Sequence, residues 1–133
     1  DPECQTILPK LQTDFSEIIN ACVNKNLKSI NLNWHNDKSL CIVLCSKGYP
    51  DNYKNNVEIK NLNQILLKND EFIFHAGTKN KNGKILSNGG RVLNFVIRSK
   101  DFKNNRNKAI DLINKINWDN GFYRKDIGFK VID

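Results

Sequence analysis

The longest apolar run in the chain, Leu40 to Cys45, has only six residues, and it limits what the chain can fold into. A helix that spans a bilayer needs about 20 apolar residues, so this run is too short to cross a membrane. The run is nearly continuous and is followed by the turn residues Ser46, Gly48 and Pro50, which is typical of a buried strand. Because a buried strand needs partner strands and cover on its faces, the run predicts a sheet inside a packed core.

Two further segments are rich in aromatic and β-branched residues, and we expect them to be strands of the same sheet. They are Phe72 to His75 and Arg91 to Arg98. Between them lies Asn82-Gly83, a strong signal for a β-hairpin, which predicts that Phe72 to Thr78 folds back on Lys84 to Leu86. Hairpin connections imply that these strands run antiparallel.

The remaining regular pattern is helical. A capping pair and apolar residues three and four positions apart predict a helix from Asp14 to Lys25. A second, amphipathic helix is predicted from Asp101 to Asn117. We expect a turn of helix at Leu62 to Leu67, and the last residues of Phe122 to Ile132 are expected to return to the sheet. The predicted class is α+β, an antiparallel β-sheet with helices packed on one side.

A polar segment divides the chain. It mixes asparagine, lysine and serine with isolated apolar residues, so we place a connection at residues 28–38, after a helical segment at 1–27 and before an α+β domain at 39–133. No basic start is followed by an apolar stretch, so no signal peptide is predicted. The chain opens with Asp-Pro in place of methionine, and we therefore expect it to be part of a longer protein.

The charge of the chain leaves two interpretations open. Lysine and arginine number 21 against 14 acidic residues, a formal net charge of +7 that suits a polyanion such as nucleic acid. Aromatic side chains that can stack on bases are available at Tyr49, Tyr53, Phe72, Phe74, Phe95 and Phe122. The lysines are scattered through every segment and most of these aromatics occupy apolar strand positions. A solvated surface is therefore the preferred interpretation, and a nucleic-acid-binding module is the alternative.

The four cysteines, Cys4, Cys22, Cys41 and Cys45, do not have the spacing of a metal site. They form no C-x-x-C pair and have no histidine cluster beside them, so we predict no metal in this chain. Cys41 and Cys45 are expected on one face of a strand, too far apart for an easy disulfide. We interpret them as buried thiols in a reducing compartment, which predicts a cytoplasmic protein.

Three polar segments stand where predicted strands end or begin: Ser46 to Pro50, Phe74 to Thr78 and Asn88 to Leu93. A fourth segment, Tyr123 to Gly128, places two cations and a carboxylate around Tyr123. Loops at strand ends can hold polar groups at fixed positions while their N–H groups bind an anion. Each segment also has a purely structural explanation, as a turn, a strand histidine or a surface ion pair. No nucleophile elbow, phosphate-binding loop or dinucleotide fingerprint is present. The residues alone predict an α+β domain with an anion site.

Read in order, DPECQ, ILPKL, CIVLCSKGYPDNY, IFHAGT, NGKILSNGGRVL and FYRKDIGFK resemble the C-terminal part of the phosphoribosylamine–glycine ligase family, also called glycinamide ribonucleotide synthetases. The resemblance covers nearly the whole chain in the family's order. Asn56 and Asn61 stand where family members commonly have glycine. Asparagine tolerates a left-handed backbone better than other non-glycine residues, so we expect these turns to be kept.

The resemblance implies an ATP-grasp ligase of purine biosynthesis. Such an enzyme joins glycine to 5-phosphoribosylamine through a glycyl phosphate, with ATP and Mg²⁺ or Mn²⁺. It implies that residues 1–27 are the tail of the ATP-grasp domain, and that the ligands for nucleotide and metal lie upstream of this chain, so the chain alone is expected to be inactive. Partners are then the two small substrates and the remainder of the enzyme, with no nucleic acid and no membrane. A protein-interaction domain that reuses the fold is a further alternative.

The resemblance also assigns site residues. Catalytic roles fall on Asp1, Glu3 and Arg91, with the two carboxylates holding the ammonium of glycine and the arginine stabilising negative charge. Gly89 and Gly90 are expected to admit the ligand close to the backbone. The full set expected to bind substrate is Lys47, Gly48, Tyr49, His75, Gly77, Thr78, Gly89, Gly90, Arg124 and Asp126.

Overall fold

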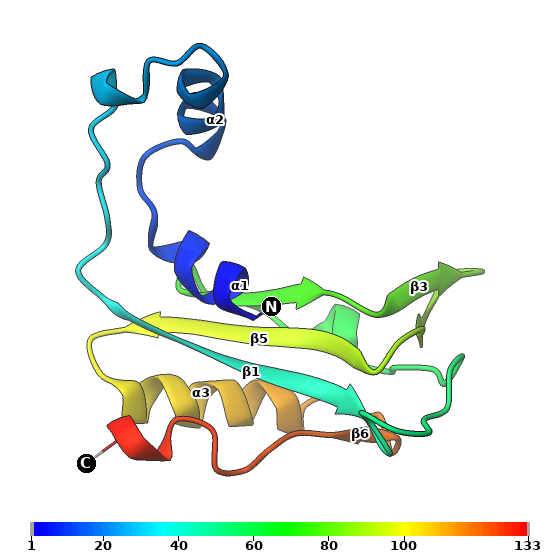
Figure 1. Cartoon of the computed structure of the whole chain (residues 1–133). Helices are drawn as coiled ribbons and strands as arrows, with labels where there is room; N and C mark the ends of the chain where they lie inside the picture. The colour runs from blue at the N-terminus through cyan, green and yellow to red at the C-terminus, as the bar shows by residue number, and fades with distance from the viewer. Residues whose placement is uncertain (1, 133) are drawn as a thin grey trace.

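The computed structural model describes residues 2–132 and contains two sheets and three α-helices (Figure 1). The helices and strands are, in chain order, α1 Glu3–Ile7, α2 Phe15–Val23, β1 Lys38–Ser46, β2 Glu71–His75, β3 Thr78–Lys81, β4 Lys84–Ser87, β5 Arg91–Ser99, α3 Phe102–Asn114 and β6 Gly121–Phe122. Short 3₁₀ turns occupy several of the connections, including the predicted turn at Leu62–Gln64. Among the described residues, no helix is both long and apolar enough to cross a membrane.

The larger sheet is antiparallel and has the strand order β2-β5-β1-β6. Its two central strands, β1 and β5, pair from Lys38 opposite Ser99 to Leu44 opposite Leu93. The nearly continuous apolar run was predicted to be a buried strand, and this is confirmed, because β1 has a partner at both edges and covers the core with alternate residues.

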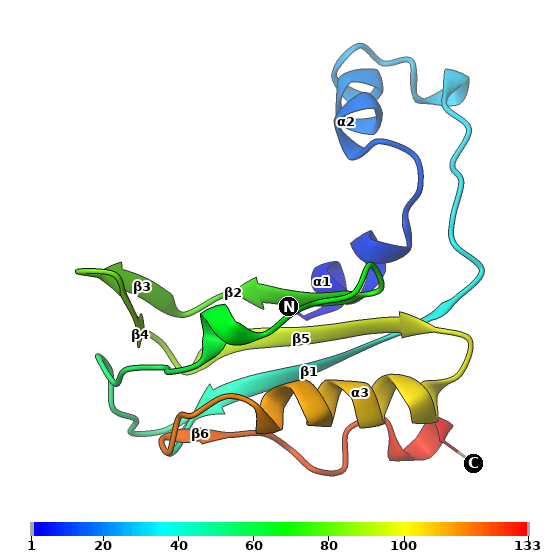
Figure 2. The same ribbon diagram turned by 180° about the vertical axis from the view of Figure 1, so that it is seen from behind.

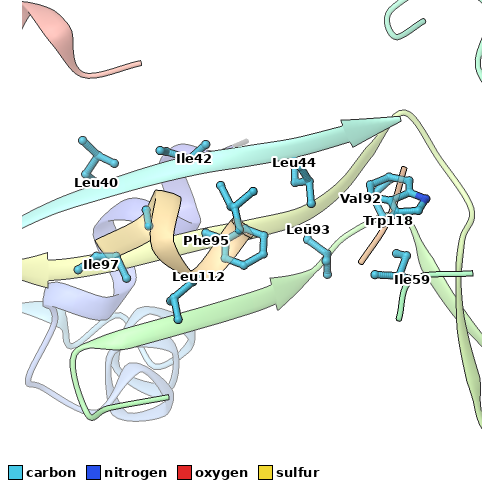
Figure 3. Close-up of a cluster of buried hydrophobic side chains, with 12 residues drawn as sticks. Leu40, Ile42, Leu44, Ile59, Val92, Leu93, Phe95, Ile97, Leu112 and Trp118 are labelled. Carbon is cyan, nitrogen blue, oxygen red and sulfur yellow. The ribbon is translucent and has the colours of Figure 1, made fainter. Parts of the chain in front are cut away.

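One face of this sheet is covered by α3 and holds the core. Leu40, Ile42 and Leu44 of β1 lie opposite Ile97, Phe95 and Leu93 of β5, and all six side chains are buried. Figure 3 shows them packed with Leu112 of α3 and with Trp118. Burying side chains of this size contributes about 1.5–3 kcal/mol each, so this layer is the main source of stability. The α+β class with a helical layer on one side of the sheet is confirmed.

The position of α3 is fixed by polar contacts at its start. Asp101 caps the helix by accepting a hydrogen bond from the N–H of Asn104 at 2.6 Å. Asn105 is fully buried, and its amide donates to the carbonyl of Lys38 at 2.9 Å, which ties α3 to the first residue of β1. The short helix α1, from the segment before the predicted domain, lies on the opposite face of the sheet (Figures 1 and 2).

Residues 12–34 form an arm that stands away from the sheet and carries α2 (Figure 1). Its helix begins as predicted, with Asp14 accepting a hydrogen bond from the N–H of Ser16 at 2.7 Å. The arm leaves several large apolar side chains exposed, namely Phe15, Ile19, Val23, Leu27, Leu32 and Trp34. An apolar face of this size on a detached helix is typical of a surface that packs against another part of a protein.

The two stems of the arm are joined to each other and to the sheet. The N–H of Gln12 donates to the carbonyl of Asn33 at 2.8 Å and that of His35 to the carbonyl of Lys10 at 2.7 Å, which forms a single antiparallel bridge between the stems. Arg98 of β5 donates through Nη1 to the carbonyl of Pro9 at 2.5 Å, and its Nε lies 3.4 Å from Oδ2 of Asp37. One arginine therefore holds both stems at the same point of the sheet.

Two expectations about strand pairing were wrong. Asn82-Gly83 does form a hairpin, but it joins β3 to β4 in a separate two-stranded sheet, while β2 pairs with β5. The chain turns between β2 and β3 because the N–H of Gly77 bonds to the carbonyl of Arg91 at 2.9 Å, which closes the ladder there. At the C-terminus it is Gly121–Phe122 that joins the sheet, whereas Phe129–Val131 forms a 3₁₀ turn after Gly128, whose φ is +80°.

Asn56 and Asn61 both form left-handed turns, as expected from the sequence. Asn56 has φ of 62° and Asn61 has φ of 66°, so both occupy the left-handed region. The expected left-handed backbone at both positions is present, and asparagine is among the residues with a side chain that tolerate this region best.

Candidate functional site

The ends of β1 and β2 and the start of β5 lie together at one end of the larger sheet, and the predicted motifs occupy these positions. The end of β1 pairs with the start of β5, with Cys45 opposite Arg91. The end of β2 reaches the same end of the sheet, with His75 opposite Leu93. Strand β6 joins on the other side, with Phe122 opposite Cys45. Segments far apart in the sequence are thus brought together, as expected of loops that follow antiparallel strands.

A β-bulge turns Arg91 toward the face that carries α1. The partner of Leu44 is Leu93 and the partner of Cys45 is Arg91, so Val92 is an extra residue on β5. Without it, the two-residue period of a strand would place Arg91 on the same face as Leu93, toward α3. Bulges commonly redirect a side chain in this way. Val92 itself is fully buried in the core beside Trp118 (Figure 3).

Arg91 borders a hollow of about 340 Å³, which we call the arginine hollow. Its floor is apolar and comes largely from the α1-facing side of β1, while Arg91 and Arg124 supply its two cationic groups. The residues that line it are Pro2, Cys41, Val43, Cys45, Tyr49, Pro50, Arg91, Phe122, Arg124 and Ile127. A pocket with apolar walls and two guanidinium groups suits a small anionic ligand that carries carbon-rich surface.

Tyr49 holds the guanidinium of Arg91. Nη1 of Arg91 donates to the hydroxyl of Tyr49 at 2.9 Å, and Cζ lies 5.8 Å from the centre of the tyrosine ring. The ring lies directly on Gly90, where an added Cβ would be 2.1 Å from Cδ2 of Tyr49. The tyrosine ring is enough to explain the missing Cβ at Gly90.

The neighbouring glycine has a similar internal reason. A Cβ on Gly77 would meet Cα of Gly89 at 2.9 Å and the carbonyl oxygen of Arg91 at 2.6 Å. Two backbone segments cross here with no room for a side chain. The crossing locks the loop after β2 to the segment that precedes Arg91.

Arg124 and Asp126 form an exposed ion pair beside the arginine hollow. Nε and Nη2 of Arg124 donate to the two carboxylate oxygens of Asp126 at 3.1 and 2.6 Å. Hydrogen bonds from Arg124 lower the pKa of Asp126 below its ordinary value. The loop is held from behind by Arg106 of α3, which donates to the carbonyl of Ile127 at 3.2 Å and to that of Lys125 at 2.5 Å.

His75 borders a different hollow. This one has a volume of about 560 Å³, lies between α1 and β2, and is lined by Cys4, Gln5, Leu8, Pro9, Phe72, Phe74 and His75. Nδ1 of His75 lies 2.8 Å from Oγ1 of Thr78, so the pair is joined by a hydrogen bond. The predicted motifs therefore meet at one end of the sheet. The side chains among them that line a hollow are divided between two hollows on the α1 face.

The other predicted residues line neither of these two hollows in the described part of the chain. Lys47 is exposed, and its N–H donates to the carbonyl of Asn120 at 2.8 Å. Gly48 has φ of +96°, and a Cβ there would lie 1.9 Å from the carbonyl oxygen of Asn52, so the turn itself requires glycine. Glu3 is exposed at the start of α1. Asp1 lies outside the described residues.

Sequence reasoning placed Cys41 and Cys45 on one face of a strand but did not predict that this face forms the floor of the arginine hollow. Cys41, Val43 and Cys45 alternate along β1, and this alternation was the available signal that they share a face. Burial raises the pKa of the Cys41 thiol to about 11. Burial also raises the pKa of Cys45, although the charge of Arg91 opposes this rise. The four cysteines are all free.

The chain offers no cage for a metal within residues 2–132, where no three potential ligands from His, Cys, Asp and Glu lie together. Six aromatic side chains of this chain could stack on nucleic-acid bases. Of these, Phe95 is fully buried in the core, while Tyr53 is exposed.

Comparison with known proteins then gives the family. Residues 39–130, which include both central strands and α3, match the family described as phosphoribosylglycinamide synthetase, C domain. The chain belongs to this family. A phosphoribosylamine–glycine ligase of Caldanaerobacter subterraneus subsp. tengcongensis is 44% identical over 96% of this chain and 30% of that protein. The bifunctional purine biosynthetic protein purD of Dictyostelium discoideum is 39% identical over 100% of this chain and 16% of that protein.

A solved structure agrees with this family. The crystal structure of the phosphoribosylamine–glycine ligase of Thermotoga maritima superimposes with a TM-score of 0.69 at 29% sequence identity, over 96% of this chain and 31% of that one. The chain thus spans about a third of the length of the phosphoribosylamine–glycine ligases that it matches.

Proposed function

We propose that this chain is the C-terminal part of an ATP-grasp phosphoribosylamine–glycine ligase. Family membership supports the proposal, and the observation that carries it is the arginine hollow, in which a bulge, a tyrosine and a glycine combine to hold Arg91. The reaction would join glycine to 5-phosphoribosylamine through glycyl phosphate, giving glycinamide ribonucleotide, ADP and phosphate in purine biosynthesis.

In this proposal the arginine hollow receives an anionic group, either the phosphate of 5-phosphoribosylamine or the acyl phosphate. The guanidinium of Arg91 carries its N–H donors in one plane, and the Tyr49 hydroxyl helps to fix that plane by accepting a hydrogen bond from Nη1. Arg124 adds a second guanidinium at the rim, and its charge is partly offset by the ion pair with Asp126. The apolar floor keeps water from one side of the bound group, which strengthens its contact with both cations.

Residues 2–132 do not bring together a set of ligands that fits a divalent metal. The Mg²⁺ or Mn²⁺ and the ATP of the proposed reaction would be held by residues outside this range. A cytoplasmic location and the absence of nucleic-acid and membrane partners are likewise part of the proposal.

A chimaera tests the function. The C-terminal part of the Caldanaerobacter ligase is replaced by this chain, and formation of glycinamide ribonucleotide from glycine, phosphoribosylamine and ATP is measured. Activity is expected, and Arg91→Ala should lower kcat/KM by about 30-fold or more, the equivalent of about 2 kcal/mol. Lys115→Ala, which removes an exposed cation at the end of α3, is the control and should change little.

Two results would count against the proposal. One is full activity in the Arg91→Ala chimaera. The other is strong oligonucleotide binding by the unaltered chain that weakens steeply with salt, without any response to glycinamide ribonucleotide, since this pattern is that of a nucleic-acid-binding module.

A further inference from the structure

Ser46, the last residue of β1, is fully buried although it is polar, and it does not line the arginine hollow. Its hydroxyl donates to the carbonyl of Gly89 at 2.8 Å, and its N–H donates to the carbonyl of Gly90 at 2.8 Å. Both hydrogen bonds therefore end on the glycine pair that directly precedes Arg91.

The same residue is joined to the other two segments of the arginine hollow. Its carbonyl accepts a hydrogen bond from the N–H of Tyr49 at 3.1 Å. On its other side it pairs with Gly121 of β6, the strand that leads to Arg124. The three segments that carry the hollow's polar side chains thus meet at Ser46.

We propose that Ser46 is a positioning residue for Arg91. Glycine has the largest backbone freedom, so two adjacent glycines need an external restraint to hold the next residue in place. Gly89 lies before β5 begins, and the Ser46 hydroxyl supplies a bond to its carbonyl that the strand ladder does not. A guanidinium that contacts a phosphate with two parallel hydrogen bonds tolerates little displacement. The inference rests on the proposed function, because it assigns Ser46 an effect on anion binding that acts through Arg91.

A matched pair of serine variants tests this role. Ser87 is also fully buried, and its hydroxyl accepts a hydrogen bond from the N–H of Val57 at 3.2 Å, in a part of the chain that does not line the arginine hollow. Ser46→Ala and Ser87→Ala each remove one buried hydroxyl and one bond to backbone. If the role of both serines is structural, the two variants should be equally affected.

The probe is ribose 5-phosphate, titrated into this chain and followed through the Nε–Hε NMR signal of Arg91. Ser46→Ala should shift that signal before any ligand is added and should weaken binding about tenfold, the equivalent of about 1.4 kcal/mol. Ser87→Ala should keep the affinity within about twofold, although its melting temperature should fall by about as much as that of Ser46→Ala. Ser46→Cys keeps a weaker donor and should lie between the two, and it serves as the test if Ser46→Ala does not fold.

The outcomes separate the inference from the function on which it rests. Equal affinities in the Ser46 and Ser87 variants, with binding lost in Arg91→Ala, would overturn the role of Ser46 and leave the proposed function in place. Unchanged binding in Arg91→Ala, or no binding by the unaltered chain, would overturn both. Weakened binding in the Ser46 variants alone supports the proposal.

Discussion

Replacing Gly90 with alanine should remove Tyr49 from Arg91. The added methyl would lie 2.1 Å from Cδ2 and 2.7 Å from Cε2 of the ring. Nonbonded carbons need about 3.5 Å or more, so the ring must move by more than about 1 Å. Such a shift breaks the 2.9 Å contact between the tyrosine hydroxyl and Nη1 of Arg91.

The size of the effect follows from these contacts. Overpacking costs about 1–3 kcal/mol, the lost hydrogen bond about 0.5–1.5 kcal/mol and the exposed cation–π contact about 0.5–1 kcal/mol. The ring can relieve part of the overpacking by moving. Gly90 does not have a left-handed φ, so alanine also stabilises the chain by about 0.4–1 kcal/mol through the unfolded state. We expect a net loss of about 1–3 kcal/mol, which lowers the melting temperature of a chain of this size by about 4–10 °C.

Thermal unfolding followed by circular dichroism measures this loss, and a double-mutant cycle assigns it to the ring. In a Tyr49→Ala background the methyl has space, so Gly90→Ala should then change the free energy of unfolding by less than about 0.5 kcal/mol. Gly89→Ala is the neighbouring control, because its Cβ would meet only backbone atoms, at 3.2 and 3.6 Å. An equal cost of Gly90→Ala with and without the tyrosine ring would refute the reasoning.

Three further changes have defined outcomes. Gly77→Ala places a methyl 2.6 and 2.9 Å from backbone atoms, so urea unfolding should show a loss of about 2–4 kcal/mol in the free energy of unfolding. Gly83→Ala has open space but a φ of +78°, and it should lose about 1 kcal/mol. The reverse order would contradict the crossing of two backbone segments at Gly77. Burial raises the pKa of Cys41 to about 11, so the folded thiol stays protonated at a pH where the unfolded one ionises. The free energy of unfolding should therefore fall by up to about 2–3 kcal/mol as the pH rises from about 9 to 11. Urea melts of Cys41→Ala should lack this part of the loss. Arg98→Met should broaden the distribution of distances between spin labels on the exposed cysteines Cys4 of α1 and Cys22 of α2. An unchanged distribution would show that this arginine does not hold the arm.

The regular elements could be predicted because their signals are local. The apolar run from Leu40, the capped helix at Asp14 and the amphipathic helix after Asp101 all form near the predicted residues. The partner of β2 could not be read in the same way. Asn82-Gly83 specifies a turn, but the strand that pairs with β2 is decided by the crossing at Gly77, a contact between distant backbone segments.

The candidate site was predictable as a set of loops and less so as a set of side chains. The motifs around Tyr49 and Arg91 do meet at one end of the sheet, as the antiparallel order of β1 and β5 requires. The bulge at Val92 decides which face Arg91 occupies, and nothing in the local sequence marks that residue as extra. For the same reason, the division between the arginine hollow and the hollow at His75 became visible only in three dimensions.

The most direct test of the account is where ribose 5-phosphate binds on this chain. NMR titration should move the Nε–Hε signals of Arg91 and Arg124 with one saturable affinity that falls with added salt, while ribose without phosphate moves neither signal. Arg91→Ala should abolish the response. Shifts confined to His75 and the hollow between α1 and β2, with both arginine signals unmoved, would contradict the claim that the arginine hollow receives the phosphate.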